Sequence, residues 1–286
     1  MTDRFPRWKV GDATLTKVVE LETTGSATWI LPDAKPDRLA GIPWLVPHFA
    51  NAEGKAVMSV HALVIESGDR RILVDTCVGN DKVRPIPGWD RRQGRFLADL
   101  ADAGFPPESI DTVLCTHLHV DHVGWNTRLE RDRWVPTFPN ARYLFAEREL
   151  AYWRDANDQV YGDVFGDSVR PILDAGLADL VAPDHAVAPG LRLEPTPGHT
   201  PGHVSVRLRS RGEDAVITGD LMHHPVQCAH PEWASRADYD ALQARKTRQG
   251  FLESSARDGA LVFGTHFAGP TAGRVVRDGA AFRFAS

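Results

Sequence analysis

Residues 116–122 read Thr116-His117-Leu118-His119-Val120-Asp121-His122, and they directly follow an apolar run, DTVLC at 111–115, that is predicted to form a buried strand. His117 and His119 are two residues apart, so an extended backbone turns both side chains to the same side. Three imidazoles and one carboxylate within six residues form a donor set of the kind that zinc prefers. A lone histidine usually has a structural role, but four such side chains at this spacing indicate a metal site.

Three further candidate ligands also stand directly after predicted strands. In α/β sheets, chemistry gathers at the edge where the strand ends release loops. A small residue precedes or lies beside each of these ligands, which lets the backbone approach a crowded centre. The three are His199 after the run at 191–197, Asp220 after 214–218, and His266 after 260–263.

The rest of the chain alternates between predicted strands and predicted helices, which favours a layered α/β architecture. No repeat, low-complexity tract or flexible linker interrupts this pattern, so a single domain over residues 1–286 is the simplest account. The mixed charges of residues 128–133 indicate a solvated turn. The predicted strands lie at 10–22, 60–67, 71–76, 111–116, 141–146, 191–197, 204–210, 214–220 and 260–266, and the predicted helices at 90–103, 147–155 and 235–258.

An irregular segment, about residues 23–56, separates the first two predicted strands. Its four prolines break regular structure, yet its tryptophans, leucines and phenylalanine require something to pack on. We consider three roles for it: a lid over the active site, an arm across a homodimer interface, or a wrap over the protein's own core.

The composition narrows the possible partners. Hydrophobic residues make up 42% of the chain and charged residues 25%, so a sizeable core is expected. The formal net charge of -5 argues against nucleic acid and anionic membrane as partners. We expect neither a signal peptide nor a transmembrane helix, because no long apolar run is present. Cys77, Cys115 and Cys228 are expected to be buried free thiols of a cytoplasmic protein.

The pattern His-x-His-x-Asp-His, followed by an isolated His, an Asp and a last His, resembles the metallo-β-lactamase superfamily. The resemblance extends over nearly the whole chain, because RILVDTCVG at 71–79 is similar to the early strand of that family. It implies a four-layer αββα sandwich with two mixed sheets and the metal site at one edge. It also implies that Asp75 braces the ligand loop.

The resemblance further implies two divalent metal ions, for which zinc is our first expectation and Mn²⁺, Fe²⁺ and Co²⁺ are alternatives. His117, His119 and His199 would bind the first ion, Asp121, His122 and His266 the second, and Asp220 would bridge them. Two such ions lower the pKa of a bridging water, whose hydroxide would attack a carbonyl or phosphoryl centre. Asp121 is also a candidate proton relay to the leaving group.

Among the branches of the superfamily, the chain is most similar to quorum-quenching lactonases and methyl parathion hydrolase-like enzymes, on the segments 137–153 and 219–227. The predicted substrate is a small molecule, either a lactone or a small carboxylic ester. Lactonases often have a tyrosine three residues after the bridging aspartate, whereas this chain has His223. We therefore expect His223 to act in catalysis, and His223 and His224 to line the pocket.

Three alternative activities stay open at this point. A phosphotriesterase or phosphodiesterase could use the same metal site. A β-lactam hydrolase is less favoured, because that branch commonly varies the first motif or uses a cysteine ligand. A mononuclear-iron oxygenase is less favoured as well, because such relatives use one metal and fewer ligands.

Overall fold

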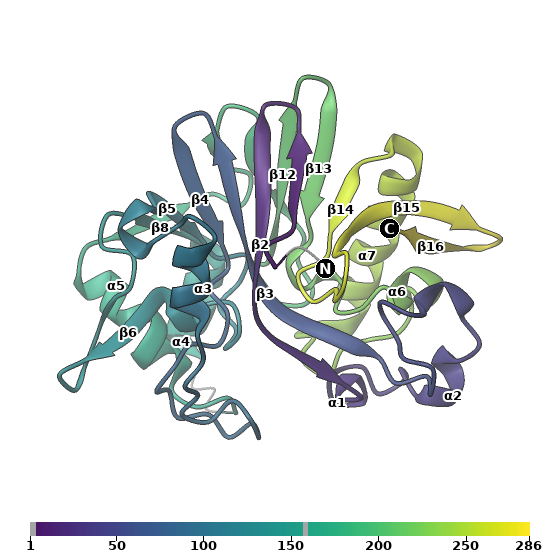
Figure 1. Ribbon diagram of the computed structural model, residues 1–286, viewed down its shortest axis with the longest axis horizontal. Coiled ribbons are helices and arrows are strands. Elements are labelled where there is room, and N and C mark those ends of the chain that lie inside the picture. The colour runs from purple at the N-terminus through teal and green to yellow at the C-terminus, as the bar shows by residue number, and fades with distance from the viewer. Residues whose placement is uncertain (1–3, 157–159) are drawn as a thin grey trace. The chain divides into compact units, whose positions relative to one another are not determined.

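The computed structural model describes residues 4–156 and 160–286. Across these residues the strands form two seven-stranded sheets and one two-stranded sheet (Figure 1). The chain folds into two compact units. Unit 1 comprises Met1–Glu20 and Val60–Pro183, and unit 2 comprises Leu21–Ser59 and Asp184–Ser286. The single domain expected over residues 1–286 stays a prediction.

The sheet of unit 1 has the strand order β1-β2-β3-β4-β5-β8-β9. β3 runs antiparallel to β4, whereas β4, β5, β8 and β9 run parallel to one another. All three residues of β5 are buried, as expected of a parallel strand that is covered on both faces. The strands are β1 (Arg7–Val10), β2 (Ala13–Thr24), β3 (Val57–Ser67), β4 (Arg70–Val74), β5 (Thr112–Leu114), β8 (Arg142–Ala146) and β9 (Ala178–Val181).

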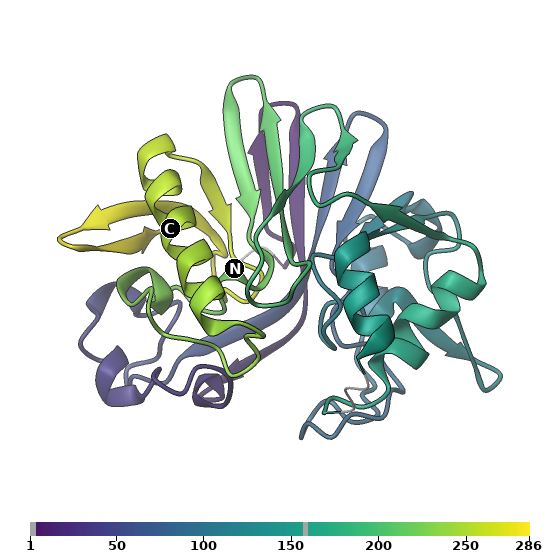
Figure 2. The same cartoon turned by 180° about the vertical axis from the view of Figure 1, so that it is seen from behind.

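Short helices and one hairpin complete unit 1. α4 follows β8 without an intervening residue, which places it next to the end of that strand (Figure 2). The elements are α3 (Phe96–Asp102), η2 (Pro107–Ser109), η3 (Gly124–Asn126), α4 (Glu147–Asp155), the π-helix η4 (Phe165–Val169), α5 (Arg170–Asp174), and the hairpin of β6 (Thr127–Glu130) and β7 (Arg133–Pro136).

The sheet of unit 2 has the strand order β10-β11-β12-β13-β14-β15-β16, in which only β13 and β14 pair in parallel among the described residues. The long helix α7 begins after Asp240, whose side chain accepts a hydrogen bond from Gln243 N, and ends at Gly259 in the left-handed conformation. The elements are β10 (Ala186–Ala188), β11 (Leu191–Pro195), β12 (Val204–Ser210), β13 (Glu213–Ile217), η5 (Gly219–Leu221), α6 (Val226–Ala229), α7 (Ala241–Asp258), β14 (Leu261–Phe263), β15 (Ala272–Asp278) and β16 (Ala281–Ala285).

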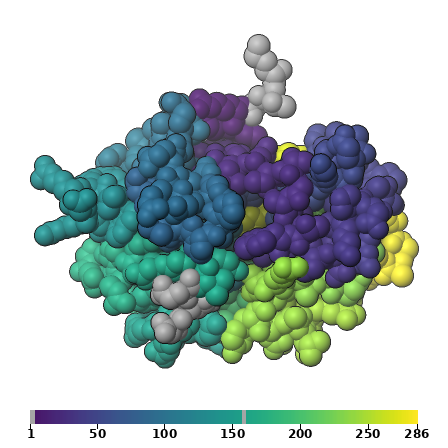
Figure 3. All heavy atoms as spheres, turned by 90° about the horizontal axis from the view of Figure 1, so that it is seen from below, coloured from purple at the N-terminus to yellow at the C-terminus, as the bar shows by residue number. Residues whose placement is uncertain are grey.

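The proline-rich segment of residues 23–56 packs its apolar side chains into the core of unit 2. Leu31, Leu39, Leu45 and Phe49 are at most 1% exposed, and the Phe49 ring lies 5.7 Å from that of Phe284. Figure 3 shows the outer side of this segment in dark purple and blue. It contains α1 (Ala27–Ile30), α2 (Pro36–Leu39) and η1 (Pro43–Leu45). The segment thus wraps over its own core, and its use as a lid or dimer arm stays a prediction.

Several local predictions were wrong. The helix expected at 90–103 begins only at Phe96, and the one expected from residue 235 begins only at Ala241. The prediction for residues 128–133 was right in part: residues 129–133 are exposed and Arg131 and Asp132 form a turn, but the flanking residues pair as the strands β6 and β7. β15 and β16 were not predicted.

The three cysteines are buried and free, as predicted. Among residues 4–156 and 160–286, no helix has the length and apolar character needed to span a bilayer.

Candidate metal centre

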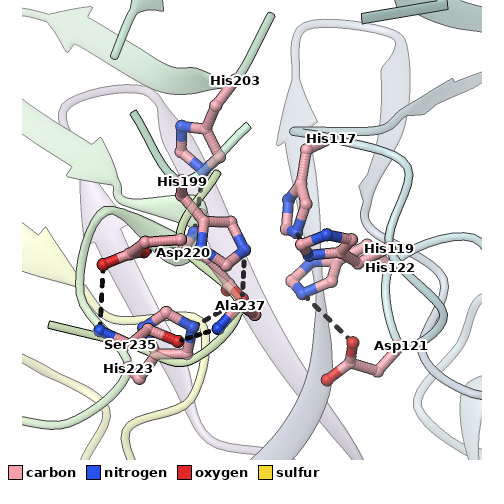
Figure 4. Close-up of polar contacts among 12 residues, drawn as sticks. His117, His119, Asp121, His122, His199, His203, Asp220, His223, Ser235 and Ala237 are labelled. Atoms are coloured by element: carbon pink, nitrogen blue, oxygen red, sulfur yellow. Dashed lines mark hydrogen bonds and ion pairs between the residues drawn. The ribbon is translucent and has the colours of Figure 1, made fainter. Parts of the chain in front are cut away.

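In unit 1, the loop that follows β5 brings three histidine rings together (Figure 4). His117 Nε2 lies 3.0 Å from His119 Nδ1, and the ring centroids of His117 and His122 are 4.0 Å apart. All three side chains are buried. Asp121 is half-buried, and its Oδ1 lies 3.7 Å from His122 Nε2. The four predicted ligands of this loop therefore gather around one region of unit 1.

Asp75 fixes this loop from the end of β4, the position that the resemblance implied. Its Oδ1 accepts a hydrogen bond from Thr116 N, and its Oδ2 accepts from Thr116 Oγ1 and from His122 Nδ1 at 2.9 Å. Asp75 has a φ of 57°, a left-handed conformation that is costly for a non-glycine residue. The three hydrogen bonds offset that cost and orient His122.

Glu149, on α4, is a second brace of the same loop and was not among the predicted site residues. Its side chain is 1% exposed, and Oε1 accepts from Leu118 N at 3.1 Å and from Trp153 Nε1 at 2.7 Å. A glutamate within an otherwise ordinary amphipathic pattern gave no signal, because its partner lies 31 residues away.

In unit 2, Asp220 lies at the centre of the remaining predicted ligands. Its Oδ2 is 3.4 Å from His199 Nε2, and its Oδ1 is 3.0 Å from His266 Nε2. All three side chains are at most 5% exposed. Each oxygen of the carboxylate thus faces a different histidine, an arrangement that suits a carboxylate shared by two cations.

The second ring nitrogen, Nδ1, of His199 and of His266 is also held by a hydrogen bond. His199 Nδ1 lies 3.0 Å from Asp238 Oδ1, and His266 Nδ1 lies 3.0 Å from the carbonyl oxygen of Ser59. Burial raises the pKa of the Asp238 carboxyl, an effect partly offset by His223 and by the N–H of Ser235. Asp238 lies within the helix predicted at 235–258, but that helix begins only at Ala241, so the residue stands before it and orients His199.

Three further histidines of unit 2 differ in their surroundings. His223 is 2% exposed, its Nε2 is 3.2 Å from Asp220 Oδ2, and its ring is parallel to that of His266 within 11°. His203 Nε2 accepts a hydrogen bond from Asp220 N, so His203 positions the carboxylate. His224 does not join the group: its Nε2 donates to Phe49 O, and burial lowers its pKa to about 4.

The donor sets of both units fit divalent metal ions. Histidines that bind metal normally donate their second ring N–H to a carboxylate or carbonyl, and His122, His199 and His266 do so through Nδ1. Two nitrogens that share a tetrahedral zinc at about 2.0–2.1 Å lie about 3.3 Å apart. The facing atoms of His117 and His119 at 3.0 Å, and of His199 and Asp220 at 3.4 Å, are close to that spacing.

Comparisons of sequence agree with these features. Residues 56–272 match the family model of the metallo-beta-lactamase superfamily. An N-acyl homoserine lactonase of Bacillus cereus is 28% identical over 127 residues, which are 44% of this chain and 43% of that relative. The lactonase AiiA of Bacillus thuringiensis subsp. kurstaki is 26% identical over the same shares. The chain therefore matches less than half the length of these curated relatives.

Solved structures extend the likeness to the whole fold. The hydrolase AbOPH of the beta lactamase superfamily matches with a TM-score of 0.81 at 23% identity, over 100% of this chain and 98% of that one. AidC, a dizinc quorum-quenching lactonase, matches with a TM-score of 0.79 at 22% identity, over 98% and 96%. The predicted fold is thereby confirmed.

Proposed function

The chain belongs to the metallo-β-lactamase superfamily, and from this premise we propose that it is a metal-dependent hydrolase that opens lactones or small carboxylic esters. One observation carries the proposal: within each unit, histidines of the pattern turn Nε2 toward an aspartate of the pattern while a carboxylate or carbonyl holds Nδ1. Such bracing costs conformational freedom and serves ligand orientation. The likeness to N-acyl homoserine lactonases and to AidC supports a lactone as the substrate.

We assign two divalent ions to this site, with zinc first and Mn²⁺, Fe²⁺ and Co²⁺ as alternatives. When bound, the ions supply Lewis acidity and lower the pKa of a coordinated water. Asp220 is the shared ligand, since its two oxygens face different histidines. The full ligand set is His117, His119, Asp121, His122, His199, Asp220 and His266.

The chain's own residues then divide the remaining work. Asp121, which is half-buried, can hold a proton at its carboxylate and pass it to the departing alcohol. His223 is buried beside Asp220 and can donate a hydrogen bond to the substrate oxygen that gains negative charge. The braces Asp75, Asp238 and Glu149 keep the histidine rings and the ligand loop in place.

The first test combines metal analysis with a substrate panel. Protein purified without added metal should contain two equivalents of zinc and turn over γ- and δ-lactones or aryl esters. His199→Ala should lose metal and activity, whereas His185→Ala, at a half-buried histidine of unit 2 outside the cluster, should keep both.

Other outcomes of the same panel would identify the alternatives. Hydrolysis of paraoxon or bis(p-nitrophenyl) phosphate without lactone turnover would indicate a phosphoesterase. Selective turnover of a β-lactam would indicate that branch instead. An iron-containing sample that hydrolyses nothing, even after zinc is added, would overturn the proposal and favour an oxygenase.

A further inference from the structure

The buried face of α7, the long helix of unit 2, carries one charged residue (Figure 1). Its buried positions follow one another at the three- and four-residue spacing of a single helix face, and they are Ala244, Arg248, Leu252 and Ser255. Arg248, in the middle of this face, is 0% exposed. A buried charge is costly unless its donors are satisfied, so the surroundings of Arg248 must provide acceptors.

The guanidinium of Arg248 donates to three backbone carbonyl oxygens. Nη1 donates to Leu221 O at 3.1 Å, Nε to Pro231 O at 2.9 Å, and Nη2 to Trp233 O at 3.0 Å. These acceptors lie outside the strands of the sheet, so their oxygens need a donor from elsewhere. Burial lowers the pKa of Arg248, but a guanidinium stays protonated at any working pH.

The first of these carbonyls belongs to the residue that follows Asp220, the carboxylate that faces two histidines. A hydrogen bond to Leu221 O therefore fixes the backbone next to the proposed shared ligand. Further along, His223 N donates to Gln227 Oε1 at 2.8 Å, and Gln227 Nε2 donates to Trp233 O, the oxygen that also accepts from the guanidinium. One buried network thus holds the segment from Asp220 to His223 at two points.

The loop of His199 is held by the same helix. Thr247, the residue before Arg248, donates from Oγ1 to Pro197 O at 2.7 Å. Adjacent residues of α7 therefore fix the backbone beside Asp220 and the backbone two residues before His199. The 3.4 Å distance between His199 Nε2 and Asp220 Oδ2 depends on this common frame, and Figure 4 shows the two side chains together.

We propose that Arg248 is a positioning residue of the metal centre, which keeps the Asp220 carboxylate at coordinating distance from His199 through the backbone of Leu221. The inference rests on the proposed function, because it concerns the ligands that we assign to unit 2. An apolar side chain at position 248 would leave three carbonyls without a donor, and the segment that carries Asp220 would move to satisfy them.

The test compares Arg248→Met and Arg248→Lys with the natural protein. Methionine keeps an unbranched stem without donors, whereas lysine keeps the charge but replaces the planar fork by a single nitrogen. In folded Arg248→Met, zinc affinity measured by chelator competition should fall about 10- to 100-fold, and Arg248→Lys should recover part of this loss. The Co²⁺-loaded variants should also show altered visible absorption bands, because these bands report the geometry of the ligands.

Leu252→Ala is the matched control, one turn along the same buried face and within the core of unit 2. It should unfold at a lower urea concentration yet keep the natural zinc affinity and Co²⁺ spectrum. The same loss of zinc affinity in Leu252→Ala would overturn the inference, because reduced stability alone would then explain the effect.

Folded Arg248 variants with natural zinc affinity and an unchanged Co²⁺ spectrum would also overturn the inference and leave the proposed function intact. If Arg248→Met does not fold, the milder Arg248→Lys decides the test. A natural protein that binds neither zinc nor cobalt would overturn the proposed function and, with it, the role of Arg248.

Discussion

Asp238 fixes the orientation of the His199 imidazole, although the two residues are 39 positions apart in the sequence. Its Oδ1 holds His199 Nδ1 while its Oδ2 accepts from Ser235 N, so the imidazole cannot rotate without breaking a buried network. Loss of such an outer partner typically costs 10- to 100-fold in metal affinity. We expect Asp238→Ala to weaken zinc binding by about that factor, measured by competition with a chromogenic chelator.

Asp240→Ala is the control for this variant, two residues along the chain. Asp240 caps α7, so its loss should lower the free energy of unfolding by about 1 kcal/mol. Zinc affinity should not change, because Asp240 contacts no histidine of the cluster through its side chain among the contacts described here. Equal zinc affinities of Asp238→Ala and the natural protein would remove the bracing role.

His223 leads to a prediction that separates catalysis from metal binding. If His223 donates to the substrate oxygen, His223→Phe should lower kcat by about 10²- to 10³-fold and leave KM and zinc content nearly unchanged. Metal analysis of the same samples is the decisive second measurement. A His223→Phe protein that has lost zinc would instead identify the imidazole as an additional ligand, which its 3.2 Å distance from Asp220 would permit.

The residues that the sequence predicted are those whose chemistry is visible locally. His117, His119 and His122 stand within six positions, and the spacing alone indicates a metal site. Asp238 and Glu149 could not be found in this way, since they lie 39 and 31 residues from the groups that they hold. Only folding brings such partners together, and single carboxylates are common on any surface.

At the scale of elements, the junction between β11 and α7 depends on one glycine. Gly198 has a φ of 135°, and a Cβ added there would lie 2.3 Å from Ala244 N at the start of α7. Gly198→Ala must therefore strain the backbone and displace the helix. We expect the free energy of unfolding to fall by about 2 kcal/mol or more, measured by urea denaturation.

Gly250, within α7, offers the opposite case. A Cβ at Gly250 meets no atom within 4 Å, and its backbone is helical. Gly250→Ala should therefore stabilise the protein by about 0.5–1 kcal/mol. If Gly198→Ala and Gly250→Ala changed the free energy of unfolding in the same direction, the close approach of Gly198 to α7 would not explain the effect of Gly198→Ala.

Strands in the interior of a sheet were predicted more accurately than the outlying strands and the first residues of helices. β5 and β14 are short apolar runs, and each pairs with a strand on either side. Their apolar composition alone therefore predicts that they are buried. β6 and β7 carry three charged residues in a small separate sheet, and cross-strand pairing holds the two strands without an apolar pattern. The helix predicted at 235–258 begins only at Ala241, because the side chain of Asp238 is engaged by His199 before the helix starts.

At the scale of the whole molecule, the irregular N-terminal segment is part of the core of unit 2. Deleting residues 30–50 would remove Leu31, Leu39, Leu45 and Phe49, all of which are buried. The predicted result is loss of folding of that unit, measured by circular dichroism. A folded, active protein with altered oligomeric state would instead support the dimer arm.

The stability of the whole protein should fall on mild acidification, and His224 is one cause. Burial lowers its folded pKa to about 4 from 6.5, so the unfolded chain binds more protons between these two pH values. The free energy of unfolding therefore rises with pH across this window, and His224 contributes about 3 kcal/mol of loss on going from pH 6.5 to 4. His224→Gln should be less stable at pH 7 yet show a flatter pH dependence in urea denaturation. His185→Gln, at a half-buried position outside this contact, should retain the natural slope, and an unchanged slope in His224→Gln would assign the acid sensitivity to other groups.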